Sequence, residues 1–141
     1  MRAGRKRPSE DAQAKYLADV ALAANFDELL ADAQSAEKQY RTAQGTAAPL
    51  AEQFVLAKRL DAALTAVMRS AFAAVRAEIG PLGYDDRIYK RKAMATPAVH
   101  ALEAEAQRLL TMRETHRLTG IPPRPEPIGL RAEPMVWEPA H

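Results

Sequence analysis

Apolar residues recur every three or four positions along one uninterrupted stretch in the middle of the chain. The stripe runs from Pro49 to Ile79 and consists of Leu50, Phe54, Ala57, Leu60, Leu64, Val67, Ala71, Val75 and Ile79. This spacing places the residues on one side of an α-helix. Pro49 suits a first helical position, and Gly80-Pro81 is a stop signal. The sequence therefore predicts a helix about 46 Å long, which needs partner helices in the same chain or in another subunit.

Two shorter helical patterns precede this stretch. Ser9 is a good N-cap for a first helix, and Asn25 with Glu28 has the spacing of a capping box for a second. Gly45 suits the C′ position that follows a helix. The alternative is a single bent helix over residues 10–44.

A short connection over residues 45–48 predicts that the second helix and the long helix lie antiparallel. After a break in the pattern, Thr96 and Pro97 predict a last helix that stops at Gly120. The expected fold is all-α: a long antiparallel helical hairpin with additional helices. Its expected parts are a basic arm (1–8), the hairpin and oligomerisation core (9–79), a basic loop (80–96), a C-terminal helix (97–120) and a proline-rich tail (121–141).

The apolar stripe of the long helix is wider than one antiparallel partner would cover, because Val55, Leu56, Met68 and Phe72 broaden it. This width favours a ring-like or bundled homo-oligomer, and a monomeric bundle of three or four helices is the alternative. The residues expected at the subunit contact are Leu60, Leu64, Val67, Met68 and Phe72.

The charge distribution is uneven, although the formal net charge is only +2. Residues 10–79 carry ten acidic and seven basic side chains, a net of −3. The basic character lies in two short clusters. One is Arg2, Arg5, Lys6 and Arg7, and the other is Arg87, Lys90, Arg91 and Lys92.

Both clusters have features of nucleic-acid contacts. The segment Gly4–Pro8 is similar to short Arg-Gly-Arg-Pro cores that lie in the narrow, strongly negative minor groove of A·T-rich DNA. In the second cluster, Tyr84 and Tyr89 alternate with the basic residues, which suits phosphate contact and stacking. The alternatives are a solvated tail or sorting signal for the first cluster, and a connector whose tyrosines cover the end of the hairpin for the second.

The last 21 residues hold six of the ten prolines and the one tryptophan. Such a segment is extended and has no core of its own. Its apolar triplet Met135, Val136 and Trp137 is expected to bind a protein partner. The alternative is that it lies over its own domain.

Catalytic chemistry has little support in this sequence. It has no cysteine, no glycine-rich phosphate loop, and only three serines, none of which pairs with a histidine and an acid. We expect no catalytic residues, no cofactor and no metal site. No apolar run approaches the length of a membrane span, so we expect no membrane partner.

One family resemblance covers most of the chain. The start Gly4–Pro8, the alanine-rich helical body, the segment Thr96–Glu105 with Arg108-Leu109-Leu110, and the close at Leu118–Pro122 are similar to phage terminase small subunits. The proline tail and the lack of an evident helix-turn-helix depart from that family.

The resemblance implies a non-catalytic, ring-forming protein of the host cytoplasm. It would bind double-stranded viral DNA and recruit it to the large terminase subunit, an ATPase and nuclease. The alternative function is a structural helical oligomer, such as a scaffold or head–tail component, with a basic arm. Salt-dependent binding to duplex DNA separates the two.

Overall fold

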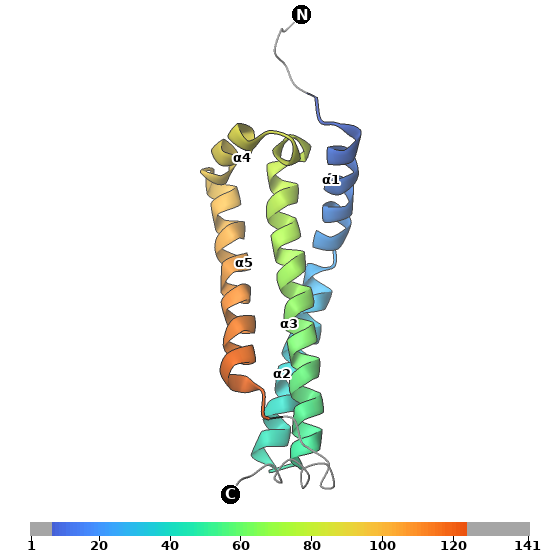
Figure 1. Ribbon diagram of the computed structural model, residues 1–141, viewed down its shortest axis with the longest axis vertical. Helices are drawn as coiled ribbons and strands as arrows, with labels where there is room; N and C mark the ends of the chain where they lie inside the picture. Colours follow the sequence, from blue (N-terminus) through green and yellow to red (C-terminus); the bar gives the residue numbers. More distant parts are fainter. Residues whose placement is uncertain (1–6, 124–141) are drawn as a thin grey trace, which may run out of the picture.

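A computed structural model describes residues 7–123, which fold into helices without any strand in that range (Figure 1). The long helix α3 (Leu50–Ile79) is central, and α1 (Glu10–Ala23), α2 (Phe26–Gly45) and α5 (Pro97–Thr115) pack against it. A 3-10 turn η1 (Pro81–Tyr84) and a short helix α4 (Arg87–Met94) close one end. A π-helical turn η2 (His116–Gly120) follows α5.

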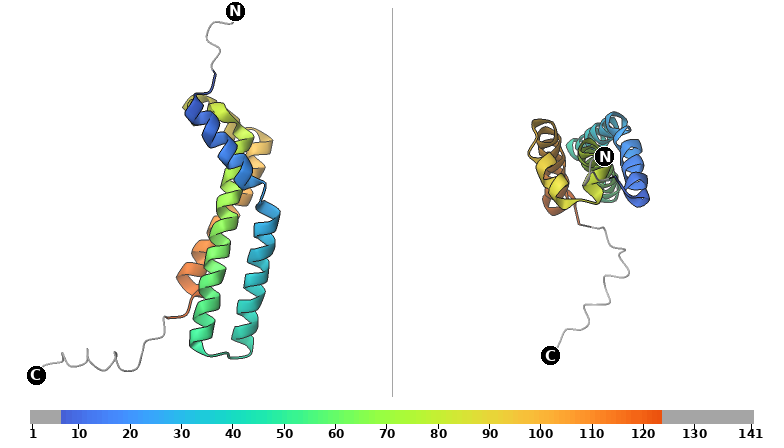
Figure 2. Two further views of the ribbon diagram at one scale, coloured as in Figure 1. Left: turned by 90° about the vertical axis from the view of Figure 1, so that its right-hand side faces the viewer. Right: turned by 90° about the horizontal axis from the view of Figure 1, so that it is seen from above.

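The helices α1 and α2 cover different halves of α3 (Figure 2). The helix α2 lies beside the N-terminal half of α3 and is joined to it by the four residues 46–49. The helix α1 lies beside the C-terminal half, and α5 packs along another side of α3. The chain therefore places its own helices on several sides of the apolar stripe.

The core follows the stripe that the sequence predicts. Small alanines alternate with larger residues at the buried positions, which lets the helices approach closely. The buried cluster is Ala33, Ala36, Tyr40, Ala57, Leu60, Leu64, Val67, Ala71, Val75, Ile79, Val99, Ala106 and Leu109.

Several predicted helix ends are confirmed by their caps. The Ser9 hydroxyl accepts a hydrogen bond from the Ala12 amide at 3.0 Å and begins α1. Thr96 caps α5 in the same way and Pro97 is its first residue. Gly80 ends α3 with a φ of 98°, a left-handed conformation that glycine adopts without a Cβ clash.

The predicted capping box at Asn25 is wrong. Asn25 precedes α2, but its side chain makes no capping hydrogen bond. Its backbone has φ −90° and ψ 5°, whereas a capping side chain needs the extended backbone that Ser9 and Thr96 have. The chain is nevertheless interrupted here, so α1 and α2 are two helices and not one bent helix.

The predicted role of Gly45 is also wrong, because Gly45 is the last residue of α2. The left-handed residue is Ala47, with a φ of 54°. The Ala47 amide donates to the Gln44 carbonyl and the Ala48 amide donates to the Ala43 carbonyl. This pair of bonds is a Schellman motif in which alanine occupies the position that usually holds glycine.

The segment 80–96, expected as a loop, contains η1 and α4. Asp86 begins α4, because its carboxylate accepts hydrogen bonds from the Ile88 and Tyr89 amides at 3.0 and 3.1 Å. No residue of α4 is buried. Only Ala93 and Met94 of this eight-residue helix pack against the core, and both stay partly exposed, so α4 has no long apolar stripe from which the sequence could predict it.

Most of the width of the α3 stripe is accounted for within one chain, and of the residues that broaden it only Val55 stays exposed. Leu60, Leu64 and Val67 are buried by helices of the same molecule, and Met68 and Phe72 are half-buried against the same core. The stripe width therefore gives no separate argument for a second subunit.

Candidate nucleic-acid interface

The basic residues of α4 form a cluster at one end of the molecule. Arg87, Lys90, Arg91 and Lys92 are all exposed, and none forms an ion pair with another described residue. Lys90 and Arg91 follow Arg87 by three and four positions, which places all three on one side of α4. This side can meet several phosphates at once.

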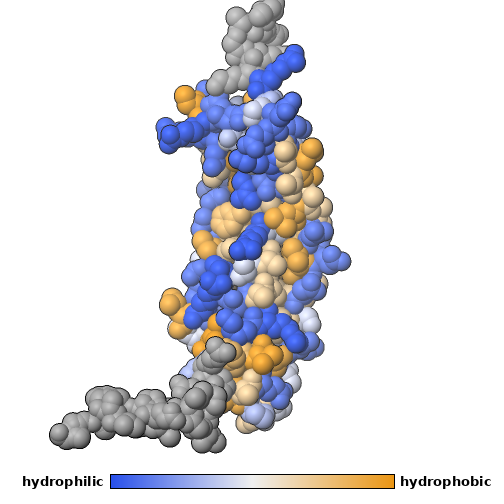
Figure 3. Space-filling model, turned by 45° about the vertical axis from the view of Figure 1, so that its right-hand side comes forward, coloured by the Kyte–Doolittle hydropathy of each residue, from blue (hydrophilic) through white to orange (hydrophobic). Residues whose placement is uncertain are grey.

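Two exposed apolar side chains accompany this charge. Ile88 is 68% exposed and Tyr89 is 41% exposed. Tyr89 is therefore available for stacking as the sequence suggested. Hydrophilic residues dominate the surface at this end of the molecule (Figure 3).

The structure brings the start of the chain to the same end. The Ser9 amide donates to one oxygen of the Asp85 carboxylate at 2.8 Å, and the Ser9 hydroxyl donates to the other at 3.0 Å. Asp85 directly precedes the cap of α4, so these bonds hold the first residue of the fold beside α4. Arg7, which is exposed, lies two residues before Ser9. The predicted contact residues Arg2, Arg5 and Lys6 lie outside the described residues.

A largely buried polar cluster next to this end connects α1, α3 and η1. The Asp19 carboxylate on α1 accepts hydrogen bonds from the Arg76 guanidinium on α3 at 2.8 and 3.1 Å. It also accepts one from the Tyr84 hydroxyl on η1. Three elements therefore meet at one carboxylate, which fixes α1 and η1 on the C-terminal end of α3.

The charges of this cluster are stabilised by their neighbours. Burial alone would raise the pKa of the Asp19 carboxyl, but hydrogen bonds from Arg76 and Tyr84 hold that pKa below its ordinary value. Burial, together with the bond to Asp19, raises the pKa of the Tyr84 hydroxyl. The hydroxyl of Tyr84 therefore has a structural role, which agrees with the alternative that this tyrosine covers the end of the hairpin.

The opposite end is held by a second set of polar contacts. The Tyr40 hydroxyl on α2 donates to the Gly120 carbonyl at 2.5 Å, and its ring contacts His116 edge-on. His116 Nε2 donates to the Ala57 carbonyl on α3 at 2.8 Å. A Cβ at Gly120 would lie 2.5 Å from His116 Nδ1, so this close approach requires glycine. These contacts fix the level of α5 relative to α2.

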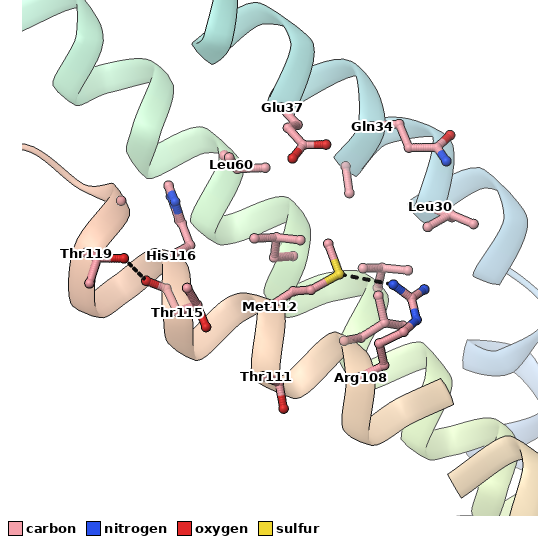
Figure 4. Close-up of a pocket in the computed structure, with 15 residues that line it drawn as sticks. Leu30, Gln34, Glu37, Leu60, Arg108, Thr111, Met112, Thr115, His116 and Thr119 are labelled. Carbon is pink, nitrogen blue, oxygen red and sulfur yellow. Dashed lines mark hydrogen bonds between the residues drawn. The ribbon is translucent and has the colours of Figure 1, made fainter. Parts of the chain in front are cut away.

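A groove of about 460 Å³ lies between α2 and α5, next to the contacts of His116 and Gly120 (Figure 4). Its floor is apolar and includes Leu60, Leu64 and Val67 of α3. Three of the five residues expected at a subunit contact therefore line an open groove, although each is largely buried. The residues expected to bind a protein partner, Met135, Val136 and Trp137, lie outside the described residues.

Sequence reasoning missed the residues that assemble the basic end. Asp85, Asp86 and Asp19 bring α1, η1 and α4 together, and only the cap at Asp86 left a local signal in the sequence. An aspartate directly before an Arg/Lys/Ala-rich segment is a helix start.

Comparison with known proteins identifies no relative of this chain. The chain matches no family model, no curated protein and no solved structure. Within residues 7–123, no helix has the length and apolar character needed to cross a membrane. Over residues 7–123 the chain is all-helical and has one strongly basic end.

Proposed function

We propose that this protein binds double-stranded DNA through its basic end and serves as a non-catalytic packaging adaptor of the terminase small subunit type. It would recruit viral DNA to the large terminase subunit, with the proline-rich tail (121–141) as the docking segment for that partner. Self-association of the adaptor belongs to the same proposal.

One observation carries the proposal. Ser9 is hydrogen-bonded to Asp85, so the exposed Arg7, two residues before Ser9, lies at the same end of the fold as the basic residues of α4. The exposed charges of α4 have no acidic partner among the described residues, so they can neutralise phosphates without first breaking ion pairs. Extended arginines before Ser9 could then enter the adjacent groove of the duplex.

The test is the salt dependence of binding to a labelled DNA duplex, measured by fluorescence anisotropy. Contact with about four phosphates per subunit gives a slope of log K against log salt of roughly −3.6. Changing Arg87, Lys90 and Arg91 together to glutamine should make the slope less negative by about 2.7, if each contacts one phosphate. Deletion of residues 1–8 should also flatten the slope.

The matched control removes the same charge from the other end. Lys38 on α2 and Lys58 and Arg59 on α3 are exposed and lie far from α4. Their triple change to glutamine should leave the slope unaltered. Equal losses from both triple variants would show that only total charge matters and that the basic end is not the contact. Absence of salt-dependent binding in the wild-type protein would favour the structural helical oligomer instead.

A further inference from the structure

A small cleft lies at the basic end, where α3, η1 and α4 meet (Figure 1). Its volume is about 220 Å³, which is less than the ~300–1,000 Å³ of sites for drug-sized ligands. The residues that line it are Arg76, Ile79, Gly80, Gly83, Tyr84 and Lys90. A cleft of this size suits a small ion or one functional group of a larger ligand.

The side chains of the cleft offer donors to a ligand. Arg76 and Lys90 have donors and no acceptor. The third polar side chain, Tyr84, directs its hydroxyl proton to Asp19. Among the described residues no carboxylate lines the cleft, and two of the six lining residues are glycines, so part of the wall is backbone that a ligand can approach closely. The ligand that fits is therefore a small anion with several acceptor atoms.

Arg76 is held in position by Asp19. Its Nε and Nη2 donate to the two carboxylate oxygens at 2.8 and 3.1 Å. A guanidinium has five N–H donors in one plane, so donors remain for a second acceptor, and the side chain is partly exposed. The guanidinium is therefore oriented before a ligand binds, which reduces the entropy that is lost on binding.

Lys90 supplies the charge that favours an anion. Asp19 offsets the charge of Arg76, whereas Lys90 is exposed and forms no ion pair with another described residue. Arg87 and Arg91 lie on the same side of α4 as Lys90 and add to the positive potential there. Removal of the Lys90 charge should therefore weaken an anion in the cleft without disturbing the bonds that hold Arg76.

We propose that this cleft binds a phosphate group, which Arg76 and Lys90 hold together. Phosphate oxygens match these donors in charge and in number of acceptors. The group has two possible sources, a backbone phosphate of bound DNA and free inorganic phosphate. The first source rests on the proposed function and adds to it, because one phosphate seated between α3 and α4 would fix the position of the duplex on the basic end.

An NMR titration of the isotope-labelled full chain with inorganic phosphate tests the site, with chloride reduced so that the ionic strength stays constant. The amide signals of Gly80 and Gly83 should shift and reach saturation. Lys90→Gln should weaken the phosphate affinity by about fivefold, which corresponds to the upper range for an exposed ion pair.

Lys92→Gln is the matched control. It removes the same charge from the same helix, but Lys92 lies about 200° around the helix from Lys90 and does not line the cleft. Its phosphate affinity should equal that of the wild-type chain. Both lysines are exposed, so circular dichroism should show unchanged helix content in both variants. Shifts that do not saturate, or equal losses from the two variants, would show that only overall charge attracts phosphate and would overturn the site.

Acetate at the same ionic strength provides a second control, because it is a small anion with a carboxylate in place of a phosphate. It should shift the amides of Gly80 and Gly83 less than phosphate does. If acetate saturates both signals at the same concentration as phosphate, the cleft does not select phosphate and the assignment fails.

Competition with a labelled duplex distinguishes the two sources of the phosphate group. At constant ionic strength, inorganic phosphate should weaken duplex binding several-fold in the wild-type chain and less in Lys90→Gln. An unchanged duplex affinity in saturating phosphate would overturn the DNA source and assign the cleft to free phosphate. A chain that binds phosphate at Gly80 and Gly83 but binds no duplex keeps the site, while the proposed function fails. A chain that binds the duplex without saturable phosphate shifts loses the site, while the proposed function stands.

Discussion

The buried carboxylate of Asp19 should be worth several times more to stability than an ordinary surface ion pair on the same helix. Replacement of Asp19 by alanine removes three hydrogen bonds, two from Arg76 and one from Tyr84. It also leaves the guanidinium and the hydroxyl without their shared acceptor. The change is small in volume, so its cost is mainly electrostatic.

The exposure of the two partners sets the magnitude. The Asp19 side chain is 13% exposed and that of Arg76 is 43% exposed, so water reaches the guanidinium after the substitution. The cost therefore falls below the ~3–5 kcal/mol of a fully buried pair. We expect a loss of about 2–3 kcal/mol in the free energy of unfolding, as for hydrogen bonds to charged groups.

Urea denaturation followed by circular dichroism measures this loss, and Lys15→Ala provides the control. Lys15 pairs with Asp11 on the same helix, but its side chain is 61% exposed. Its loss should cost less than about 0.5 kcal/mol. A double-mutant cycle of Asp19→Ala with Arg76→Ala should show a coupling of about 1 kcal/mol or more. If Asp19→Ala costs no more than Lys15→Ala, the cluster does not hold α1 in place.

Three further results are expected. Ala47→Gly should raise the free energy of unfolding by about 1 kcal/mol, because glycine adopts the left-handed conformation without strain, and Gly45→Ala should raise it by roughly 0.5 kcal/mol, because alanine favours the helix. A lower stability of Ala47→Gly in urea denaturation would contradict the Schellman assignment. The hydrogen bond from Arg117 holds the pKa of Asp61 below its ordinary value. The pair therefore contributes its full stabilisation above the unfolded carboxyl pKa of about 3.9, and this stabilisation is lost as pH falls through the lower pKa of the folded state. Asp61→Asn should therefore remove part of the acid-side fall in unfolding free energy, and an unchanged pH profile would count against it. Deletion of residues 122–141 should abolish binding of the proposed partner, the large terminase subunit, in a pull-down, while DNA affinity stays intact. A lowered melting temperature of the deletion variant would instead show that the tail packs on its own fold.

The start of α1, the end of α3 and the start of α5 were predictable because local chemistry decides them. Ser9 and Thr96 cap their helices in an extended backbone conformation, and Gly80 ends α3 where a positive φ is needed. The all-helical class followed from the same signals together with the apolar stripe. These features depend on neighbours within about four positions, which a sequence displays directly.

Apart from the local errors at Asn25 and Gly45, the features that failed depend on short or distant contacts. The helix α4 is short and turns only Ala93 and Met94 toward the core, so no long apolar stripe revealed it. The stripe on α3 could not show whether its partners came from the same chain or from another. The hydrogen bonds between Ser9 and Asp85 are a contact across 76 positions, and no local pattern encodes it.

The attachment of α1 has a consequence for local unfolding. Only Ala12 and Asp19 of this helix are buried, while Leu17 and Val20 remain exposed. Because so little apolar surface is buried there, α1 should open at a lower free energy than the rest of the fold and exchange its amide hydrogens faster. Each opening separates Ser9 and the adjacent Arg7 from α4. A DNA duplex that contacts both Arg7 and α4 would stabilise the closed state by its binding free energy. Slower hydrogen exchange of the α1 amides would therefore show that DNA occupies the basic end.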